Sequence, residues 1–182
     1  MAIVVDGKML LTYSDYVRFP DDGKRHELIG GERCVTPSPV PKHQRVSRWI
    51  QFQLFEQIEV PGLGEVIDAP MDLVLSDIDV VQPDLLVVLA PNRAIITEKH
   101  VRGAPDLVVE ITSPSTRPRD LELKKDLYRR HRVPEYWIAL TDSDEVERHV
   151  LRGDVYELAG RHADAIDFGG LAGVRVDLTK VW

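Results

Sequence analysis

The chain has 182 residues, of which 43% are hydrophobic and 29% charged, with a formal net charge of −7. This length and balance predict one globular domain over residues 1–182, with a short N-terminal extension. The negative charge argues against a general nucleic-acid binder, since phosphate-backbone affinity comes mainly from Lys and Arg. The single cysteine, Cys34, excludes an internal disulfide and a cysteine-based zinc cage. The N-terminal apolar run is too short for a signal peptide and no segment is long enough to span a membrane, so we expect a cytoplasmic protein with no membrane partner.

The N-terminal extension is predicted to contain a short helix and a hairpin. Either Thr12 or Ser14 can cap a short helix that ends before Pro20. Two β-type segments, 26–29 and 32–36, are separated by a Gly-Gly pair that can adopt positive φ, which is typical of a tight hairpin.

A core helix is predicted to begin near Pro41 or Lys42 and to end before Pro61. Its apolar side chains recur every four residues, at Val46, Ile50, Leu54 and Ile58, and Trp49 with Phe52 or Phe55 is expected to widen this core stripe. His43 lies in the first turn, where a lone histidine is more often a surface or capping group than a functional one. We keep both interpretations open.

The middle of the chain is predicted to form three strands, at about residues 65–67, 71–75 and 85–89. Residues 94–96 form either a linker or a further short strand. Asp77 and Asp79 occupy a turn-like SDID sequence, so we expect both to be solvated. Asp84 differs, because it follows Pro83 and opens the apolar run LLVVLA.

Residues 106–112 are predicted to form a core strand, since they are rich in β-branched residues and lie between two prolines. Period-two alternation puts Leu107, Val109 and Ile111 on one face and Glu110 on the other. A carboxylate in so apolar a strand is costly to desolvate unless a metal or another cation balances it.

A basic helix is predicted over residues 120–131, with Ser113 and Ser115 available to cap its start. At about 100° per residue, one arc of about 160° contains seven side chains. They are Asp120, Leu121, Leu123, Lys124, Leu127, Tyr128 and His131. Lys124 lies near the centre of this arc, where its ammonium either snorkels to water or faces Glu110. Tyr128 fits a core side chain with a bonded hydroxyl better than a catalytic acid.

The C-terminal third is predicted to be mainly β-structure. The expected strands lie at 133–140, 145–151, 155–158 and 174–176.

Asp84 and Glu110 support a metal-dependent chemistry, because neighbouring strands lie about 5 Å apart and two carboxylates can then share one hard cation. Mg²⁺, or Mn²⁺ in its place, prefers oxygen ligands, and the backbone carbonyl of Ile111 and a substrate phosphate could complete the shell. Lys124 could orient or deprotonate a metal-bound water or stabilise phosphoryl charge. This arrangement indicates phosphodiester hydrolysis.

The sequence resembles the PD-(D/E)XK nuclease superfamily, in the branch called the Uma-two family of restriction endonucleases. The resemblance spans most of the chain and rests on an ordered set of motifs. They are TYSDY, HELIGGE, SPVPKHQ, QPD, GAPDLVVEITSPST, RDLELKKDLY and VPEYWI.

The resemblance implies an α/β (α+β) restriction-endonuclease-like core, a mixed β-sheet flanked by helices, with Asp84 and Glu110 as metal ligands. Thr112 departs from the superfamily pattern, because a lysine ordinarily stands two residues after the acid. Other branches carry this lysine on the following helix, where Lys124 is the matching position. Glu27 resembles an additional acid that some members supply from an N-terminal element; the alternative is an ion pair with a hairpin arginine, Arg25 or Arg33.

The resulting prediction is a Mg²⁺-dependent endonuclease acting on duplex DNA, with Lys125, Arg129 and Arg132 as possible phosphate contacts. Cutting both strands commonly requires two sites related by two-fold symmetry, so we expect a homodimer. The alternatives are a catalytically inactive nuclease-fold binding or scaffold protein and a nuclease that acts on RNA.

Overall fold

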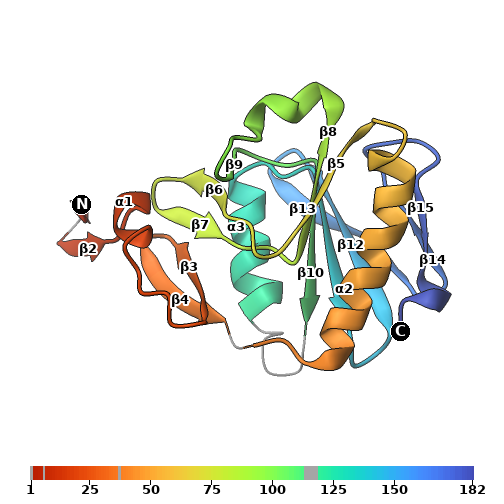
Figure 1. Cartoon of the computed structure of the whole chain (residues 1–182), viewed down its shortest axis with the longest axis horizontal. Helices are drawn as coiled ribbons and strands as arrows, with labels where there is room; N and C mark the ends of the chain where they lie inside the picture. The colour runs from red at the N-terminus through yellow and green to blue at the C-terminus, as the bar shows by residue number, and fades with distance from the viewer. Residues whose placement is uncertain (1, 6, 37, 113–118) are drawn as a thin grey trace.

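The computed structural model describes residues 2–5, 7–36, 38–112 and 119–182. Within these residues a mixed sheet of six strands forms the centre of the molecule, in the order β13-β12-β11-β10-β8-β5 (Figure 1). The strands are β5 (Gly64–Asp68), β8 (Leu85–Leu89), β10 (Leu107–Thr112), β11 (Glu135–Leu140), β12 (Glu145–Arg152) and β13 (Val155–His162). β10 and β11 are parallel, and the other neighbours are antiparallel.

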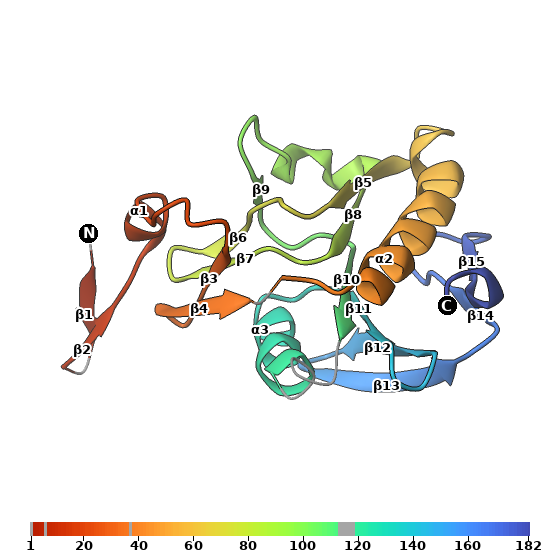
Figure 2. The same cartoon turned by 60° about the horizontal axis from the view of Figure 1, so that its bottom comes forward.

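A second sheet, with five strands in the described part of the chain, lies beside the first in the order β4-β3-β7-β6-β9. It consists of β3 (Arg25–Ile29), β4 (Glu32–Thr36), β6 (Leu73–Ser76), β7 (Asp79–Val81) and β9 (Val101–Arg102). Two small hairpins complete the β-structure, β1 (Ile3–Val5) with β2 (Lys8–Leu10) and β14 (Ala165–Asp167) with β15 (Arg175–Asp177). Figure 2 shows β1, β2 and the short helix α1 (Tyr13–Tyr16) at one end of the molecule.

Two longer helical segments cover opposite faces of the central sheet (Figure 1). The first is α2 (Pro41–Leu54), which a π-helical turn, Phe55–Glu59, continues. The second is a π-helical segment, Arg119–Lys124, followed by α3 (Lys125–Arg130). Single 3-10 segments lie at Ala90–Ile95 and Leu178–Lys180. No helix in the described ranges is long and apolar enough to cross a membrane.

The predicted alternation along β10 is confirmed. Leu107, Val109 and Ile111 pack in the core under α2, while Val108 packs in the core under α3. Glu110 faces the α3 side, where it contacts side chains from the helical segment. β10 therefore presents its one carboxylate to the helix that supplies Lys124.

One part of the helix prediction is wrong. Leu123 was expected to face inward, but it is 40% exposed. The first part of the segment is π-helical, and its wider turns shift the phase of the side chains relative to an α-helix. Lys124 and Leu127 still face inward. The capping role predicted for Ser113 and Ser115 lies outside the described residues, as do the side chains of Asp120 and Leu121.

Asp79 is a second correction, because it is buried rather than solvated. It begins strand β7, and its carboxylate accepts hydrogen bonds from the Gly30 N–H at 2.7 Å and the Ser76 hydroxyl at 2.9 Å. The His131 ring lies 2.9 Å from the same carboxylate. These partners outweigh burial and lower the pKa of Asp79. Asp77, by contrast, is solvated as expected.

Candidate active site

Asp84 and Glu110 come from neighbouring strands of the central sheet. β8 and β10 are antiparallel with Leu85 opposite Val109, so the next pair in this register is Asp84 and Glu110. Asp84 Oδ2 also accepts a hydrogen bond of 2.8 Å from the Ile111 N–H. Both acids are buried, which the apolar sequence of the two strands predicts.

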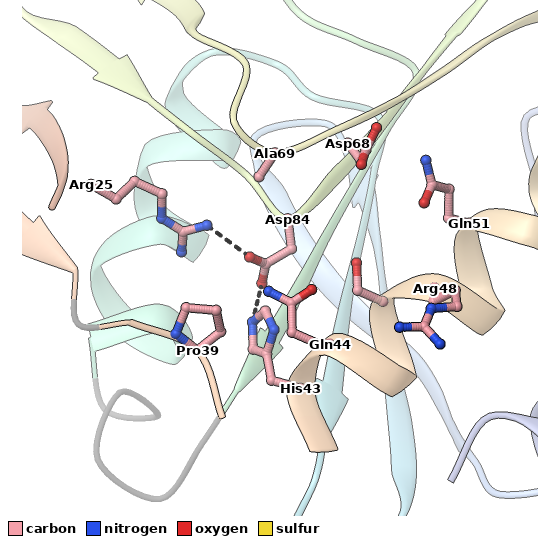
Figure 3. Close-up of a pocket in the computed structure, with 10 residues that line it drawn as sticks. Arg25, Pro39, His43, Gln44, Arg48, Gln51, Asp68, Ala69 and Asp84 are labelled. Atoms are coloured by element: carbon pink, nitrogen blue, oxygen red, sulfur yellow. Dashed lines mark hydrogen bonds and ion pairs between the residues drawn. The ribbon is translucent and has the colours of Figure 1, made fainter. Parts of the chain in front are cut away.

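The carboxylate of Asp84 is balanced by two basic side chains from other elements. Arg25 Nη1, at the start of β3, lies 2.9 Å from Asp84 Oδ1, and His43 Nε2, in the first turn of α2, lies 3.0 Å from Oδ2 (Figure 3). Burial alone would raise the pKa of Asp84. The contact with His43 and the charges of Arg25 and Lys124 outweigh burial and lower this pKa to about 2. Asp84 is therefore ionised throughout the neutral range.

Lys124 is buried between two acids and does not snorkel to water. Its Nζ lies 2.8 Å from Glu110 Oε1 and 3.0 Å from Glu27 Oε1. The Gln82 N–H also donates to Glu27 Oε1, at 3.0 Å. Glu27 thus reaches the site from β3 and pairs with Lys124, whereas Arg33, one of its predicted partners, hydrogen-bonds His26. Burial would raise the pKa of Glu27, but Lys124 and its other partners lower it.

Tyr128 occupies the remaining side of Glu110. It is fully buried, and its hydroxyl donates a hydrogen bond of 2.7 Å to Glu110 Oε1. Burial and the nearby carboxylate raise its pKa well above the usual value, so the hydroxyl remains protonated. This geometry agrees with a core side chain that has a bonded hydroxyl.

A polar cavity of about 230 Å³ opens beside Asp84 (Figure 3). Its lining residues come from β3, the segment before α2, α2 itself and the end of β5. They are Arg25, Pro39, His43, Gln44, Ser47, Arg48, Gln51, Asp68, Ala69 and Asp84. In the described part of the chain, the side chains of Gln44, Arg48 and Gln51 have no hydrogen-bonding partner and remain available to a ligand.

The sequence interpretation missed these α2 residues and the Arg25 contact with Asp84. Gln44, Arg48 and Gln51 recur at helical spacing on one side of α2, and this polar stripe was a detectable signal. The contact between Arg25 and Asp84 joins residues 59 positions apart, which no local pattern encodes.

The three predicted phosphate contacts on and after α3 do not line this cavity. Lys125 and Arg129 border a separate hollow next to β13, and Arg129 is paired with Asp126 at 2.6 Å. Arg132 is bound to the Asp154 carboxylate and to the Gly153 carbonyl at 2.8 Å. Their role in binding a substrate stays a prediction.

The donor set fits a cation that uses few protein ligands. Among the described residues, no group of three or more His, Cys, Asp or Glu side chains is arranged as a metal cage. Asp84 and Glu110 offer hard oxygen donors, and Mg²⁺ commonly binds through one or two carboxylates together with waters and substrate phosphates. The pair therefore suits Mg²⁺ better than a metal that needs sulfur ligands.

Comparison with known proteins agrees with this architecture. The fold is similar to that of a solved structure from Anabaena variabilis ATCC 29413, described as "a putative nuclease belonging to DUF820", with a TM-score of 0.69 and 16% sequence identity over 81% of this chain and 83% of that chain. This similarity shows the fold, which agrees with the predicted α+β class of a mixed sheet flanked by helices. No curated protein matches the sequence. Residues 13–173 match the profile of the Uma2 family, described as "Putative restriction endonuclease". The resemblance inferred from the motifs is confirmed, and the chain belongs to the Uma2 family.

Proposed function

We propose that this protein is a Mg²⁺-dependent DNA endonuclease. The observation that carries the proposal is the meeting of Asp84, Glu110 and Lys124, with the Lys124 amine 2.8 Å from Glu110 and an open polar cavity beside Asp84. Two acids and an amine suit phosphodiester hydrolysis, and Asp84 is the member of this group that lines the cavity.

Asp84 and Glu110 would hold Mg²⁺, or Mn²⁺ as a substitute, with the Ile111 carbonyl as a further ligand. When bound, the ion would polarise a phosphoryl oxygen and lower the pKa of an attacking water. Lys124 places a positive charge where negative charge develops on the phosphoryl oxygens. Glu27 acts as a positioning residue, because it holds the Lys124 amine from the side opposite Glu110.

The cavity supplies the contacts for the substrate backbone. Arg48, Gln44 and Gln51 offer donors that suit phosphate and sugar oxygens, and Arg25 adds a second guanidinium. Arg25 contacts Asp84 Oδ1 at 2.9 Å and also lines the cavity, so its guanidinium lies where a substrate phosphate could meet it. The positive groups are thus concentrated at the cavity. A nucleic-acid backbone could therefore bind there although the net charge of the chain is −7.

A supercoiled plasmid tests this proposal. We expect nicking with Mg²⁺ or Mn²⁺, none with EDTA, and none by Glu110→Gln, which keeps the shape of the side chain. Asp77→Asn is the matched control, because Asp77 is an exposed acid from the same part of the chain and should leave nicking unchanged. Nicking that persists in a folded Glu110→Gln variant would refute the proposed role of this carboxylate.

One observation favours the non-catalytic alternative. Asp84 already contacts Arg25 and His43, and Glu110 already contacts Lys124, so both acids have partners without a metal ion. Calorimetric binding of Mn²⁺ without cleavage of plasmid or of single-stranded RNA would identify a binding protein. If the protein cleaves only the RNA, and Glu110→Gln abolishes this cleavage, the proposed active site is correct and the substrate is RNA rather than DNA.

A further inference from the structure

The outer face of α2 and its π-helical continuation carries large aromatic side chains. Their expected place in the core stripe is wrong, because they lie on the side of the helix away from the buried Ile50 and Leu54. Trp49, Phe52 and Phe55 are 39%, 47% and 42% exposed, and the Trp49 and Phe52 rings meet edge to face with centroids 5.9 Å apart. Figure 1 shows α2 lying over the sheet with its outer side uncovered. A contiguous exposed apolar patch of this kind commonly marks an interaction site.

Charged residues flank this aromatic patch in a symmetric pattern. Arg45 and Arg48 lie seven and four residues before Phe52, and Glu56 and Glu59 lie four and seven residues after it. Trp49 and Phe55 lie three residues on either side. At about 100° per residue, the side chains of Arg45, Arg48, Trp49 and Phe52 fall within an arc of about 100°. Phe55 and Glu56, in the π-helical turn that follows, are exposed as well. The face is therefore basic at one end, aromatic in the middle and acidic at the other end.

The charges at the two ends are largely uncommitted. Within the described residues, Arg45, Arg48 and Glu56 have no hydrogen-bonding or ion-pair partner. Glu59 is partly used, because its Oε2 accepts a hydrogen bond of 2.9 Å from the Val66 N–H. Arg45 and Glu56 are thus free to pair with a second copy, whereas Arg48 also lines the Asp84 cavity.

We propose that this face is the interface of a homodimer, in which α2 of a second copy packs antiparallel about a two-fold axis beside Phe52. Antiparallel packing brings the basic end of each helix to the acidic end of the other, and the symmetry makes every such contact twice. Parallel packing would instead oppose like charges. The aromatic centre supplies the buried contacts that usually dominate binding energy.

The neighbouring contacts agree with a second copy as the occupant. Gln53 Nε2 donates to the Asp177 carbonyl at 3.1 Å and Gln57 Nε2 to the Arg175 carbonyl at 2.8 Å, so one flank of the helix is fixed to β15. A nucleic acid along the same face would meet the acidic end containing Glu56. The face is held in place by its own fold, so the two copies can dock with little backbone change.

The dimer has a consequence for the candidate active site. His43 precedes Phe52 by nine residues, or about 14 Å along the helix at about 1.5 Å per residue. The two Asp84 cavities would then be separated by about 27 Å along the helix pair. The interface goes beyond the proposed function, and its test measures assembly rather than cleavage, so either can fail without the other.

The first test is the mass of the full chain by sedimentation velocity over a range of concentrations. We expect a dimer for the wild type and a monomer for Phe52→Glu, because an exposed site accepts the charge in the monomer but not in a packed interface. Leu158→Glu is the matched control, since Leu158 is 49% exposed on β13, away from α2, and should leave the dimer intact. A monomeric wild type, or a dimer that survives Phe52→Glu, would overturn the proposal.

The second test distinguishes antiparallel packing from any other mode. Arg45→Glu combined with Arg48→Glu makes the face all acidic, and Glu56→Arg makes most of it basic. Each variant alone should show a dissociation constant raised about tenfold or more by like-charge repulsion. An equimolar mixture should form heterodimers more tightly than either variant forms homodimers. If the mixture assembles no better than the separate variants, antiparallel pairing of this face is wrong.

Discussion

Lys124 is the most informative residue to replace, because its ammonium is buried between two carboxylates. It lies 3.0 Å from Glu27 Oε1 and 2.8 Å from Glu110 Oε1. Lys124→Met preserves the apolar stem and removes the charge. Removing one partner of a buried ion pair typically costs about 3–5 kcal/mol, because the opposite charge remains buried and unpaired. We therefore expect the free energy of unfolding at neutral pH to fall by about 4 kcal/mol, measured by urea denaturation.

The pH dependence tests the cause of this loss. In the wild type, burial would raise the pKa of Glu27, but Lys124, the Gln82 N–H and Arg25 lower it. Glu27 then contributes stability above its unfolded pKa and loses that contribution as the pH falls through its folded pKa. Without the Lys124 ammonium, burial raises the pKa of Glu27 with less opposition, so this acid becomes neutral more readily. Lowering the pH should therefore reduce the free energy of unfolding less in the variant than in the wild type. The difference between the two proteins should be largest near neutral pH and smaller near pH 4.

A second substitution separates stability from catalysis. Adding Glu27→Gln to Lys124→Met removes one unpaired buried charge, so it should restore part of the stability and none of the plasmid nicking. A Lys124→Met protein as stable as the wild type, or equally destabilised at both pH values, would refute the ion-pair account. Nicking by Lys124→Met at the wild-type rate would refute its catalytic role.

Three further substitutions test individual contacts. Tyr128→Phe removes the hydroxyl that donates to Glu110 and should lower the free energy of unfolding by about 1.5–3 kcal/mol in urea denaturation. The pKa of Asp84 is about 2 in the folded protein, below its usual 3.8, so this group adds stability above about pH 4 that is lost as the pH falls toward 2. An acid titration followed by circular dichroism should show about 2–3 kcal/mol of this loss in the wild type and a flatter profile in Asp84→Asn. Asp79→Ala leaves His131 and the other donors without their acceptor, and thermal unfolding should show a loss of about 1–3 kcal/mol, whereas an unchanged melting temperature would contradict the contacts described here.

The sequence was sufficient for the parts of the site that depend on local pattern. Alternation along β10 placed Glu110 opposite the α2 core, and the Pro-Asp step before an apolar run placed Asp84 immediately before β8. Helical periodicity placed Lys124 inward, although the π-helical turn moved Leu123 out to solvent. These features require only the order of residues within one element.

Contacts between distant elements could not be predicted in this way. The burial of Asp79 depends on His131, 52 residues later, and the pairing of Arg25 with Asp84 spans 59 residues. The local sequence around Asp79 and around Arg25 does not indicate whether His131 or Asp84 will lie nearby in the folded chain. Their roles are decided by how the two sheets and α3 come together, which is a property of the tertiary fold.

The position of Lys124 shows that the site depends on where an amine lies rather than on which element carries it. A lysine at position 112 would begin on the same strand face as Glu110, about 7 Å further along β10. Thr112 instead donates a hydrogen bond of 3.2 Å to the Ala139 carbonyl of β11 and contributes to the sheet. The ammonium reaches Glu110 from the opposing helical segment, where Glu27 fixes it from the other side. Because electrostatic stabilisation depends on the distance and burial of the charge, an amine delivered from the helix can meet the same requirement as one from the strand.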